Sequence, residues 1–227
     1  MSFRAKEAIE DAEVVVGYRT YLDLITELIA GKEVLASGMT QEVERCRQAL
    51  DRALQGKRIA LVTSGDPGIY GMAGLILEMV HKEGMRLPVE IIPGITAALA
   101  AAASLGAPLM NDFAAISLSD LMTPWEIIER RLAAAAEADF VTVLYNPRSS
   151  TRREQLARAR EIFLRYRDEN TPVGVVRNCK RGDEEINIHC LRDFLDLRID
   201  MLTTVIIGNS TTFTFDKFMI TPRGYRL

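Results

Sequence analysis

The sequence predicts an α/β protein built from two domains. Apolar, strand-like stretches alternate with helix-like stretches along the 227 residues, an order typical of sheets covered by helices, with parallel strands prominent. Hydrophobic residues make up 48% of the chain, enough for a sizeable core. The segment GAPLMND at 106–112 carries the Gly and Pro residues expected of a linker. We therefore expect one domain over residues 1–107 and a second over 108–227.

The first predicted domain alternates helices with short apolar strands. Helical spacing occurs over 3–12, 21–30, 41–55, 69–82 and 95–105. Strands are expected at 14–16, in the stretch RIALVTSGD, and in VEIIPG. The buried strand in RIALVTSGD is expected to end in a loop at 64–68.

The second predicted domain continues the alternation less regularly. Its strand-like stretches lie at 114–118, 140–144, 173–176 and 203–207. Its helical patterns cover about 124–138 and 152–167. The irregular order favours a sheet with mixed strand directions.

Charge and composition exclude several functional classes. With 28 basic and 31 acidic residues, the net charge of −3 attracts neither nucleic acid nor anionic lipid. No apolar run approaches the roughly 20 residues that span a bilayer, and residues 1–12 do not form a secretory signal. Three scattered cysteines suit a reducing compartment. We expect a cytoplasmic protein with no nucleic-acid or membrane partner and, with two histidines and no CxxC pair, no metal.

The first candidate ligand loop is TSGDPGIYG at 63–71, at the end of a predicted strand. In open α/β sheets ligands bind beyond the carboxyl ends of strands. Glycines on both sides of Asp66 and Pro67 let the backbone approach a ligand, and Asp66 can accept hydrogen bonds from an amine or hydroxyl. An ordinary strand-to-helix turn, with Asp66 capping the helix, explains the same residues.

Two more strand ends have unusual composition. IIPGITAALAAA at 91–102 combines a Pro-Gly turn with Thr96 and small residues, which also suits a helix packed tightly on a sheet. VLYNPRSSTR at 143–152 contains Arg148 and Arg152 and is followed by Arg153. Arginines hold carboxylates bidentately, although a solvated helix start has the same composition. The chain has no GxxxxGK[ST], no GxGxxG after its first strand and no catalytic-triad pattern.

Together these segments resemble one known family. SGDPGIYG, PGITAALAAAASLGAPL, DFAAISLSDLMTPWEIIERRL, LYNPRSSTR and TTVIIGNS are similar, in that order, to motifs of the precorrin and cobalt-precorrin methyltransferases, a family of tetrapyrrole methyltransferases. The first two motifs are shared across the family, whereas SLSDLMTPWEIIERRL and LYNPRSSTR are most similar to its C17-methylating members. The resemblance covers nearly the whole chain.

The resemblance implies a fold and an activity. The fold is the tetrapyrrole methylase fold, two α/β domains with S-adenosylmethionine in the cleft between them, assembled as a homodimer. The activity is methylation of C17 of precorrin-3B or cobalt-precorrin-3 (cobalt-factor III), coupled to ring contraction in cobalamin biosynthesis. The tetrapyrrole is then the small-molecule partner.

The resemblance also implies site residues. Cofactor contacts fall on Gly65, Asp66, Pro67, Ile69, Thr96, Ala97, Tyr145, Asn146, Asn178, Thr203 and Thr204. Charge and placement add Arg148, Arg152, Lys180 and Arg181 for the acidic side chains of the macrocycle. Residues that could shape its binding trough are Tyr70, Asp112, Ser119, Asp120 and Trp125. Asp66 and Tyr70 are the candidates for a proton-transfer role.

One departure from the family keeps other hypotheses open. Family members begin with a central strand and a VGxGPG loop, and Met1 aligns after that loop. A non-catalytic protein that binds the cofactor is therefore one alternative. Methylation of another carbon by a sister enzyme is a second. A generic nucleotide-binding domain is a third, but it leaves LYNPRSSTR and SLSDLMTPW unexplained.

Overall fold

The computed structural model describes residues 1–226, which fold into two compact units. Unit 1 comprises Met1–Thr96 and unit 2 begins at Ala97. The composition of the 106–112 segment predicts a boundary after Ala107. The structure groups the helix α5 (Ala97–Leu105) with unit 2 because its buried alanines belong to the same core cluster as strands of that unit.

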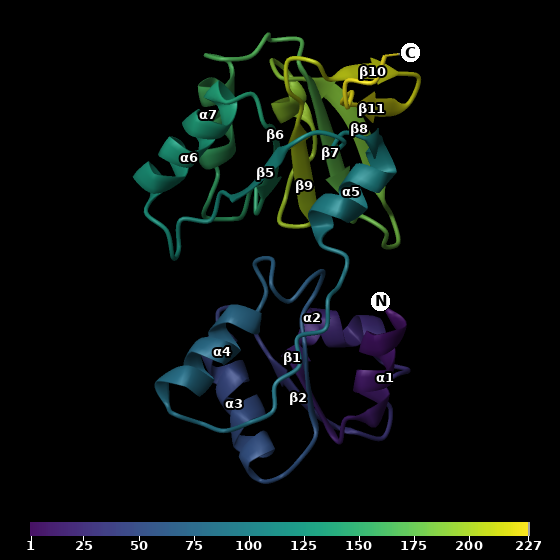
Figure 1. Ribbon diagram of the computed structural model, residues 1–227, viewed down its shortest axis with the longest axis vertical. Coiled ribbons are helices and arrows are strands. Elements are labelled where there is room, and N and C mark those ends of the chain that lie inside the picture. The colour runs from purple at the N-terminus through teal and green to yellow at the C-terminus, as the bar shows by residue number, and fades with distance from the viewer. Residues whose placement is uncertain (227) are drawn as a thin grey trace. The chain divides into compact units, whose positions relative to one another are not determined.

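Unit 1 is built on a parallel sheet in the order β2-β1-β3 (Figure 1). The strands are β1 (Val14–Tyr18), β2 (Glu33–Ser37) and β3 (Ile59–Val62). Three successive valines make β1 apolar on both sides, as a strand covered on both faces requires. Val15 belongs to one core cluster, and Val14 and Val16 belong to another.

Four helices cover the unit 1 sheet. They are α1 (Phe3–Asp11), α2 (Arg19–Leu22), α3 (Glu42–Leu54) and α4 (Ala73–Lys82), and a 3₁₀ turn, η1 (Asp23–Ile25), follows α2. The Val15 cluster includes Ile9 of α1 and Leu22 of α2. Ala49 of α3 packs with Val14 and Val16 on the other face. Burial of these apolar side chains is the main stabilising contribution to unit 1.

The described part of unit 2 forms a mixed five-stranded sheet in the order β5-β6-β9-β7-β8. Its strands are β5 (Phe113–Ser117), β6 (Val141–Tyr145), β7 (Pro172–Arg177), β8 (Glu185–Cys190) and β9 (Thr203–Ile207). β5 and β6 are parallel, whereas β9 runs antiparallel to both β6 and β7. This confirms the expected mixed directions.

Helices lie on both faces of the unit 2 sheet (Figure 1). The helices α6 (Trp125–Glu137) and α7 (Gln155–Phe163), with the 3₁₀ turn η2 (Phe194–Asp196), contribute to the largest core cluster. The helix α5 contributes to a second cluster on the opposite face, where Leu105 fills the space above Gly174. A Cβ at Gly174 would lie 2.3 Å from Leu105 Cδ1, so the absence of a side chain there makes room for the helix.

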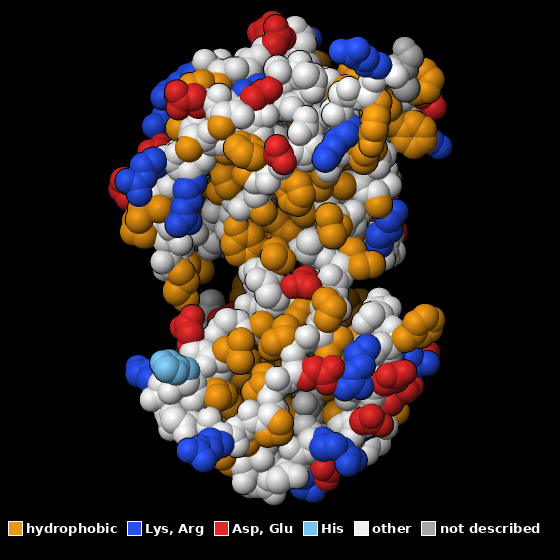
Figure 2. Space-filling view, in the orientation of Figure 1, with side chains coloured by type: hydrophobic (Ala, Val, Ile, Leu, Met, Phe, Trp, Pro, Cys, Tyr) orange, Lys and Arg blue, Asp and Glu red, His pale blue; other side chains and the backbone are white. Residues whose placement is uncertain are grey.

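A small sheet in unit 2 joins β4 (Gly106–Ala107), β10 (Phe213–Phe215) and β11 (Phe218–Ile220). In the β10–β11 hairpin, Phe215 pairs with Phe218, and Met219 faces the core. Alternation therefore places Phe213, Phe215 and Phe218 on the outer face, where Figure 2 shows hydrophobic side chains at the surface.

Several predicted elements differ from the observed ones. The stretch VEIIPG, which is predicted to form a strand, pairs with no strand of the described chain. The segment is instead tethered by an ion pair between Glu90 and Arg4 and by a hydrogen bond from Gly94. The predicted helix over 21–30 breaks into α2, η1 and turns. The strands β2, β4, β8, β10 and β11 were not predicted.

Two helices start at least three residues later than their patterns predict. α4 begins at Ala73 rather than residue 69 because residues 66–72 form a tight loop. In that loop Ala73 N donates to Pro67 O, and a Cβ at Gly71 would lie 2.5 Å from the same oxygen. α7 begins at Gln155 because Arg152 turns inward.

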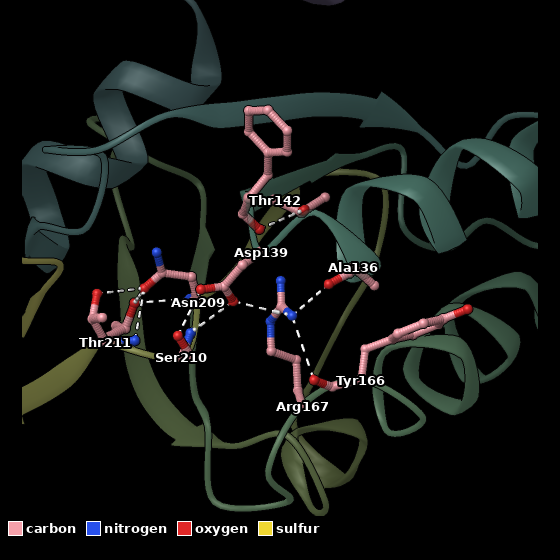
Figure 3. Close-up of polar contacts among 10 residues, drawn as sticks. Ala136, Asp139, Thr142, Tyr166, Arg167, Asn209, Ser210 and Thr211 are labelled. Carbon is pink, nitrogen blue, oxygen red and sulfur yellow. Dashed lines mark hydrogen bonds and ion pairs between the residues drawn. The ribbon is translucent and has the colours of Figure 1, made fainter.

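A buried arginine ties together the ends of three elements in unit 2 (Figure 3). Arg167, which follows α7, donates to Ala136 O at the end of α6 and lies 3.1 Å from Asp139 Oδ1. Asp139 in turn accepts hydrogen bonds from Ser210 N and Oγ after β9. Burial lowers the pKa of Arg167, and Asp139 opposes that effect.

Candidate active site

Predicted site residues meet at one edge of the unit 2 sheet. β9 lies between β6 and β7 and runs antiparallel to both, so it begins where they end. Ser117 at the end of β5 pairs with Tyr145, and Arg177 pairs with Thr203. We call this edge the unit 2 rim. Its residues are Ser117–Ser119, Tyr145–Asn146, Arg177–Asn178 and Thr203–Thr204.

Two asparagines turn the chain sharply at the rim. Asn146 and Asn178 have φ of 51° and 52°, the left-handed region that asparagine tolerates better than most residues. Asn146 Nδ2 donates to Ser117 Oγ at 3.0 Å, and Asn178 N donates to Leu202 O at 3.0 Å. Uncommon backbone conformations of this kind concentrate at ligand sites.

Tyr145 connects the rim to the start of α5. Its hydroxyl accepts a hydrogen bond from Ala98 N at 3.0 Å. This contact brings Ala97 close to Tyr145, although the two residues are far apart in the sequence. Thr96 directly precedes the helix.

The two arginines predicted to bind carboxylates differ in burial. Arg152 is only 6% exposed, and its Nε donates to Asn146 O at 3.0 Å. Burial lowers its pKa, and Asp120 opposes that shift. Arg148 lines a surface pocket of about 340 Å³ together with Ser149, Ser150 and residues 199–202. Arg148 is therefore accessible to a ligand, whereas Arg152 supports the Asn146 turn; whether either meets substrate stays a prediction.

The turn after β7 places two cations at the rim. Lys180 and Arg181 follow Asn178, and Lys180 is exposed. Glu184 holds this turn, because its Oε1 accepts from Lys180 N at 3.0 Å and from Ser104 Oγ at 2.7 Å. These two bonds, the first being the larger cause, lower the pKa of Glu184.

The predicted trough residues do not all lie together. Ser119 and Asp120 follow β5, and Ser119 N donates to Ser117 Oγ at the rim. Trp125 begins α6 and packs against the core. Asp112 precedes β5, which places it at the opposite edge of the sheet. The structure therefore separates Asp112 from Ser119 and Asp120 within unit 2.

Asp66 holds two loops of unit 1 together. Its Oδ1 accepts from Gly68 N at 2.8 Å and its Oδ2 accepts from Gly94 N at 2.9 Å. The bonds from Gly94 and then Gly68 hold the pKa of Asp66 below its usual range. A Cβ at Gly94 would lie 1.9 Å from Gly65 O, so the two backbones touch. Because α4 begins only at Ala73, Asp66 does not cap it.

The exposed tip of the same loop contains two other candidates. Ile69 and Tyr70 are 43% and 56% exposed. Tyr70 has φ of 54°, which is unusual for an aromatic residue. Pro67 O receives the hydrogen bond that precedes α4. The loop thus presents its side chains outward from a fixed backbone.

Sequence reasoning missed three residues that shape the rim. They are Ser117, Arg177 and Asp200. Ser117 accepts a hydrogen bond from Asn146, Arg177 donates one to Asp200, and Asp200 accepts another from Leu202 N. The available signal was a polar residue at the last position of an apolar strand, as Arg177 in PVGVVR. Neither a metal-binding group of three His, Cys, Asp or Glu nor a helix able to cross a membrane occurs among residues 1–226.

Known proteins are similar to this chain over nearly all of its residues. A probable cobalt-factor III C(17)-methyltransferase of Salmonella typhimurium is 51% identical over 227 residues, covering 100% of this chain and 94% of that protein. A cobalt-factor III methyltransferase of Priestia megaterium is 48% identical over 98% of this chain, which spans only 42% of that protein. The crystal structure of the methyltransferase CobJ superimposes with a TM-score of 0.92 at 37% identity, covering 98% of this chain and 93% of that one.

A family match agrees with these similarities. The family described as tetrapyrrole (corrin/porphyrin) methylases matches residues 1–194, which include all of unit 1 and most of unit 2. The expected family resemblance and the tetrapyrrole methylase fold of the chain are confirmed by this match and by the superposition. The chain belongs to the tetrapyrrole methylase family.

Proposed function

We propose that this protein transfers a methyl group from S-adenosylmethionine to C17 of cobalt-factor III or precorrin-3B, coupled to ring contraction, in cobalamin biosynthesis. Family membership and the names of relatives about 50% identical support this activity over the alternatives. The observation that carries the proposal is the meeting of predicted cofactor residues at the unit 2 rim. Those residues are Tyr145, Asn146, Asn178, Thr203 and Thr204.

The chemistry of the rim fits S-adenosylmethionine. The cofactor offers an adenine edge, ribose hydroxyls, an amine and a carboxylate, which require both donors and acceptors. Asn146 and Asn178 supply amides at fixed positions, and Thr204 adds a hydroxyl. The nearby start of α5 adds backbone amides, and Tyr145 OH already binds one of them. Such mixed polar groups on an otherwise apolar sheet edge are typical of cofactor sites.

The chain's main catalytic contribution is positioning. When bound, S-adenosylmethionine supplies an electrophilic methyl carbon on a positively charged sulfur. Holding two reactants in line gains about 7–11 kcal/mol, so the absence of a triad in the sequence is compatible with the reaction. The fixed turns at Asn146 and Asn178 supply rigidity of that kind.

The acidic side chains of the macrocycle require basic partners, and the chain has basic groups near the rim. Arg148, Lys180 and Arg181 are the cations we assign to them. Arg148 lines a surface pocket and Lys180 is exposed. The ion pair between Lys180 and Glu184 is loose, with 3.9 Å between Nζ and Oε2. A carboxylate of the substrate can therefore replace that solvent-exposed contact.

Asp66 and Tyr70 remain the candidates for moving a proton during ring contraction. Asp66 is held ionised by two backbone amides, so it has no proton to donate, and its lowered pKa makes it a weak base. Tyr70 is exposed at the loop tip. We propose Asp66 mainly as the residue that fixes the loop at 65–71.

One assay tests the proposed function. The purified chain is incubated with methyl-labelled S-adenosylmethionine and either cobalt-factor III or precorrin-3B, and the products are analysed by mass spectrometry and NMR. We expect one label per macrocycle, located at C17. A label on another carbon would support a sister enzyme. Tight cofactor binding without any transfer would support the non-catalytic alternative.

We also propose a cytoplasmic homodimer, as the family resemblance implies. Light scattering during size-exclusion chromatography should give about twice the mass of one chain. A monomeric mass at micromolar concentration would contradict the dimer. Fractionation of cells that produce the protein should recover it with cytoplasmic enzymes.

A further inference from the structure

Asp200 closes a tight turn immediately before β9. Its Oδ1 accepts from Leu202 N at 2.8 Å and from Thr203 Oγ1 at 3.2 Å. Two backbone amides complete the turn. Thr203 N donates to Asp200 O at 3.2 Å, and Asp200 N donates to the side-chain Oγ1 of Thr203 at 3.1 Å. Four contacts therefore fix the backbone from residue 200 to residue 203.

Arg177 anchors that turn to the sheet. It is the last residue of β7, and its side chain is only 11% exposed. Its Nε donates to Asp200 Oδ2 at 2.8 Å, and its Nη1 lies 3.0 Å from Glu185 Oε1 on β8. A guanidinium removed from water requires charged partners of this kind. Arg177 thus joins the start of β9 to the end of β7.

The anchored turn determines where two predicted cofactor segments lie. Leu202 O accepts from Asn178 N at 3.0 Å, so the position of Leu202 sets the turn after β7. Thr203 Oγ1 is already engaged with Asp200 on both its donor and acceptor sides. The hydroxyl of Thr203 is therefore committed to the turn, and Thr204 is the residue of the pair whose side chain is not used there.

We propose that Asp200 and Arg177 are positioning residues that hold Asn178 and the segment Leu202–Thr204 in the geometry that binds S-adenosylmethionine. This inference rests on the proposed function. It adds two residues to the site, neither of which was among the predicted contacts. It also gives Thr203 a structural role within the same turn.

The two carboxylates on Arg177 provide a matched pair of variants. Asp200→Ala removes the partner that also binds Leu202 N, whereas Glu185→Gln removes only the negative charge of the partner on β8 and leaves the turn intact. We expect Asp200→Ala to raise the dissociation constant for S-adenosylmethionine about tenfold by isothermal titration, on the scale of one or two lost hydrogen bonds. Glu185→Gln should change it less than about twofold.

Two further readouts separate positioning from general destabilisation. Hydrogen exchange should accelerate in a peptide covering 200–205 of Asp200→Ala and stay unchanged in Glu185→Gln, at matched melting temperature. The conservative variant Asp200→Asn keeps an acceptor for Leu202 N and should restore most of the affinity. In turnover, KM for the cofactor should rise while kcat changes little.

The outcomes distinguish the two proposals. If the wild-type chain does not bind S-adenosylmethionine, the proposed function fails and this inference fails with it. If the wild type binds but Asp200→Ala and Glu185→Gln weaken binding equally, the positioning role is overturned while the function stands. If Asp200→Ala does not fold, Arg177→Gln is compared with Glu185→Gln, since Arg177 holds Asp200 as well as Glu185. The positioning role requires weaker cofactor binding in Arg177→Gln, and equal affinities overturn it.

Discussion

The two units hold their candidate site loops by different means. In unit 1 the loop at 65–71 and the PGIT segment at 93–96 touch through backbone atoms, and the missing side chain of Gly94 makes that approach possible. In unit 2 the rim is held by side chains, among them Ser117, Arg152 and the Arg177–Asp200 pair. Backbone packing tolerates little substitution, whereas side-chain contacts can be lost one at a time.

The sheets beneath these loops also differ. Unit 1 has three parallel strands, and its extended segment 89–92 pairs with none of them. The described part of unit 2 has a five-stranded sheet with helices on both faces and the largest core cluster. We therefore expect the loops of unit 1 to depend on a few close contacts and those of unit 2 to be supported by the core.

The largest expected effect is at the backbone contact of unit 1. Gly94→Ala places a Cβ within 1.9 Å of Gly65 O, and neither backbone can move without breaking the Asp66 bonds. We expect a loss of about 3 kcal/mol in unfolding free energy, measured by urea denaturation. The matched control is Gly74→Ala in α4, where no atom lies within 4 Å, and a gain of about 0.5–1 kcal/mol is expected. Equal effects at the two glycines would contradict the close approach.

The second comparison concerns the buried arginine of unit 2. Asp139→Ala leaves Arg167 buried without its carboxylate, and we expect it to cost about 2 kcal/mol. Arg167→Met should cost less, because the Nε and Nη2 of Arg167 have no hydrogen-bond partner among the described residues. Thermal and urea unfolding of both variants measure the difference. A larger loss for Arg167→Met would show that the guanidinium makes contacts beyond those in Figure 3.

The two candidate substrate arginines sharpen the comparison at the rim. Arg148→Gln should weaken tetrapyrrole binding about tenfold and leave cofactor binding intact, because Arg148 lines the surface pocket. Arg152→Gln should weaken both ligands, since Arg152 holds the Asn146 carbonyl. Fluorescence titration of the macrocycle and calorimetry of the cofactor measure the two affinities. If Arg152→Gln loses only tetrapyrrole binding and keeps cofactor binding, Arg152 contacts the substrate directly.

The smallest expected effect is the pH dependence of the unit 1 loop. Folding lowers the pKa of Asp66, so its stabilising contribution is fully present above the unfolded value of about 3.9 and is lost as pH falls through the lower folded value. Hydrogen exchange of Gly68 and Gly94 amides, corrected for intrinsic rates, should therefore accelerate below about pH 4. Asp66→Asn should remove this dependence. If the variant keeps the same pH profile, another group is responsible.

The α/β class, the mixed second sheet and four of the strands in the five-stranded sheet of unit 2 follow from the sequence. Thr203–Ile207 is a run of β-branched residues whose strand was predicted with the observed bounds. Glycines and prolines likewise marked the loops at 64–68 and 93–94, because backbone conformation restricts which residues fit there. The family resemblance added the prediction of which residues bind the cofactor.

Only the tertiary structure decided which side chains meet. VEIIPG has the composition of a strand but pairs with no strand in the described chain, since a ladder needs a neighbour that a local pattern does not supply. Arg152 reads as a surface cation but is buried on the Asn146 turn. Asp112 and Ser119 lie at opposite edges of one sheet although few residues separate them. Sequence spacing fixes local backbone preference, whereas side-chain contacts depend on strand order and burial.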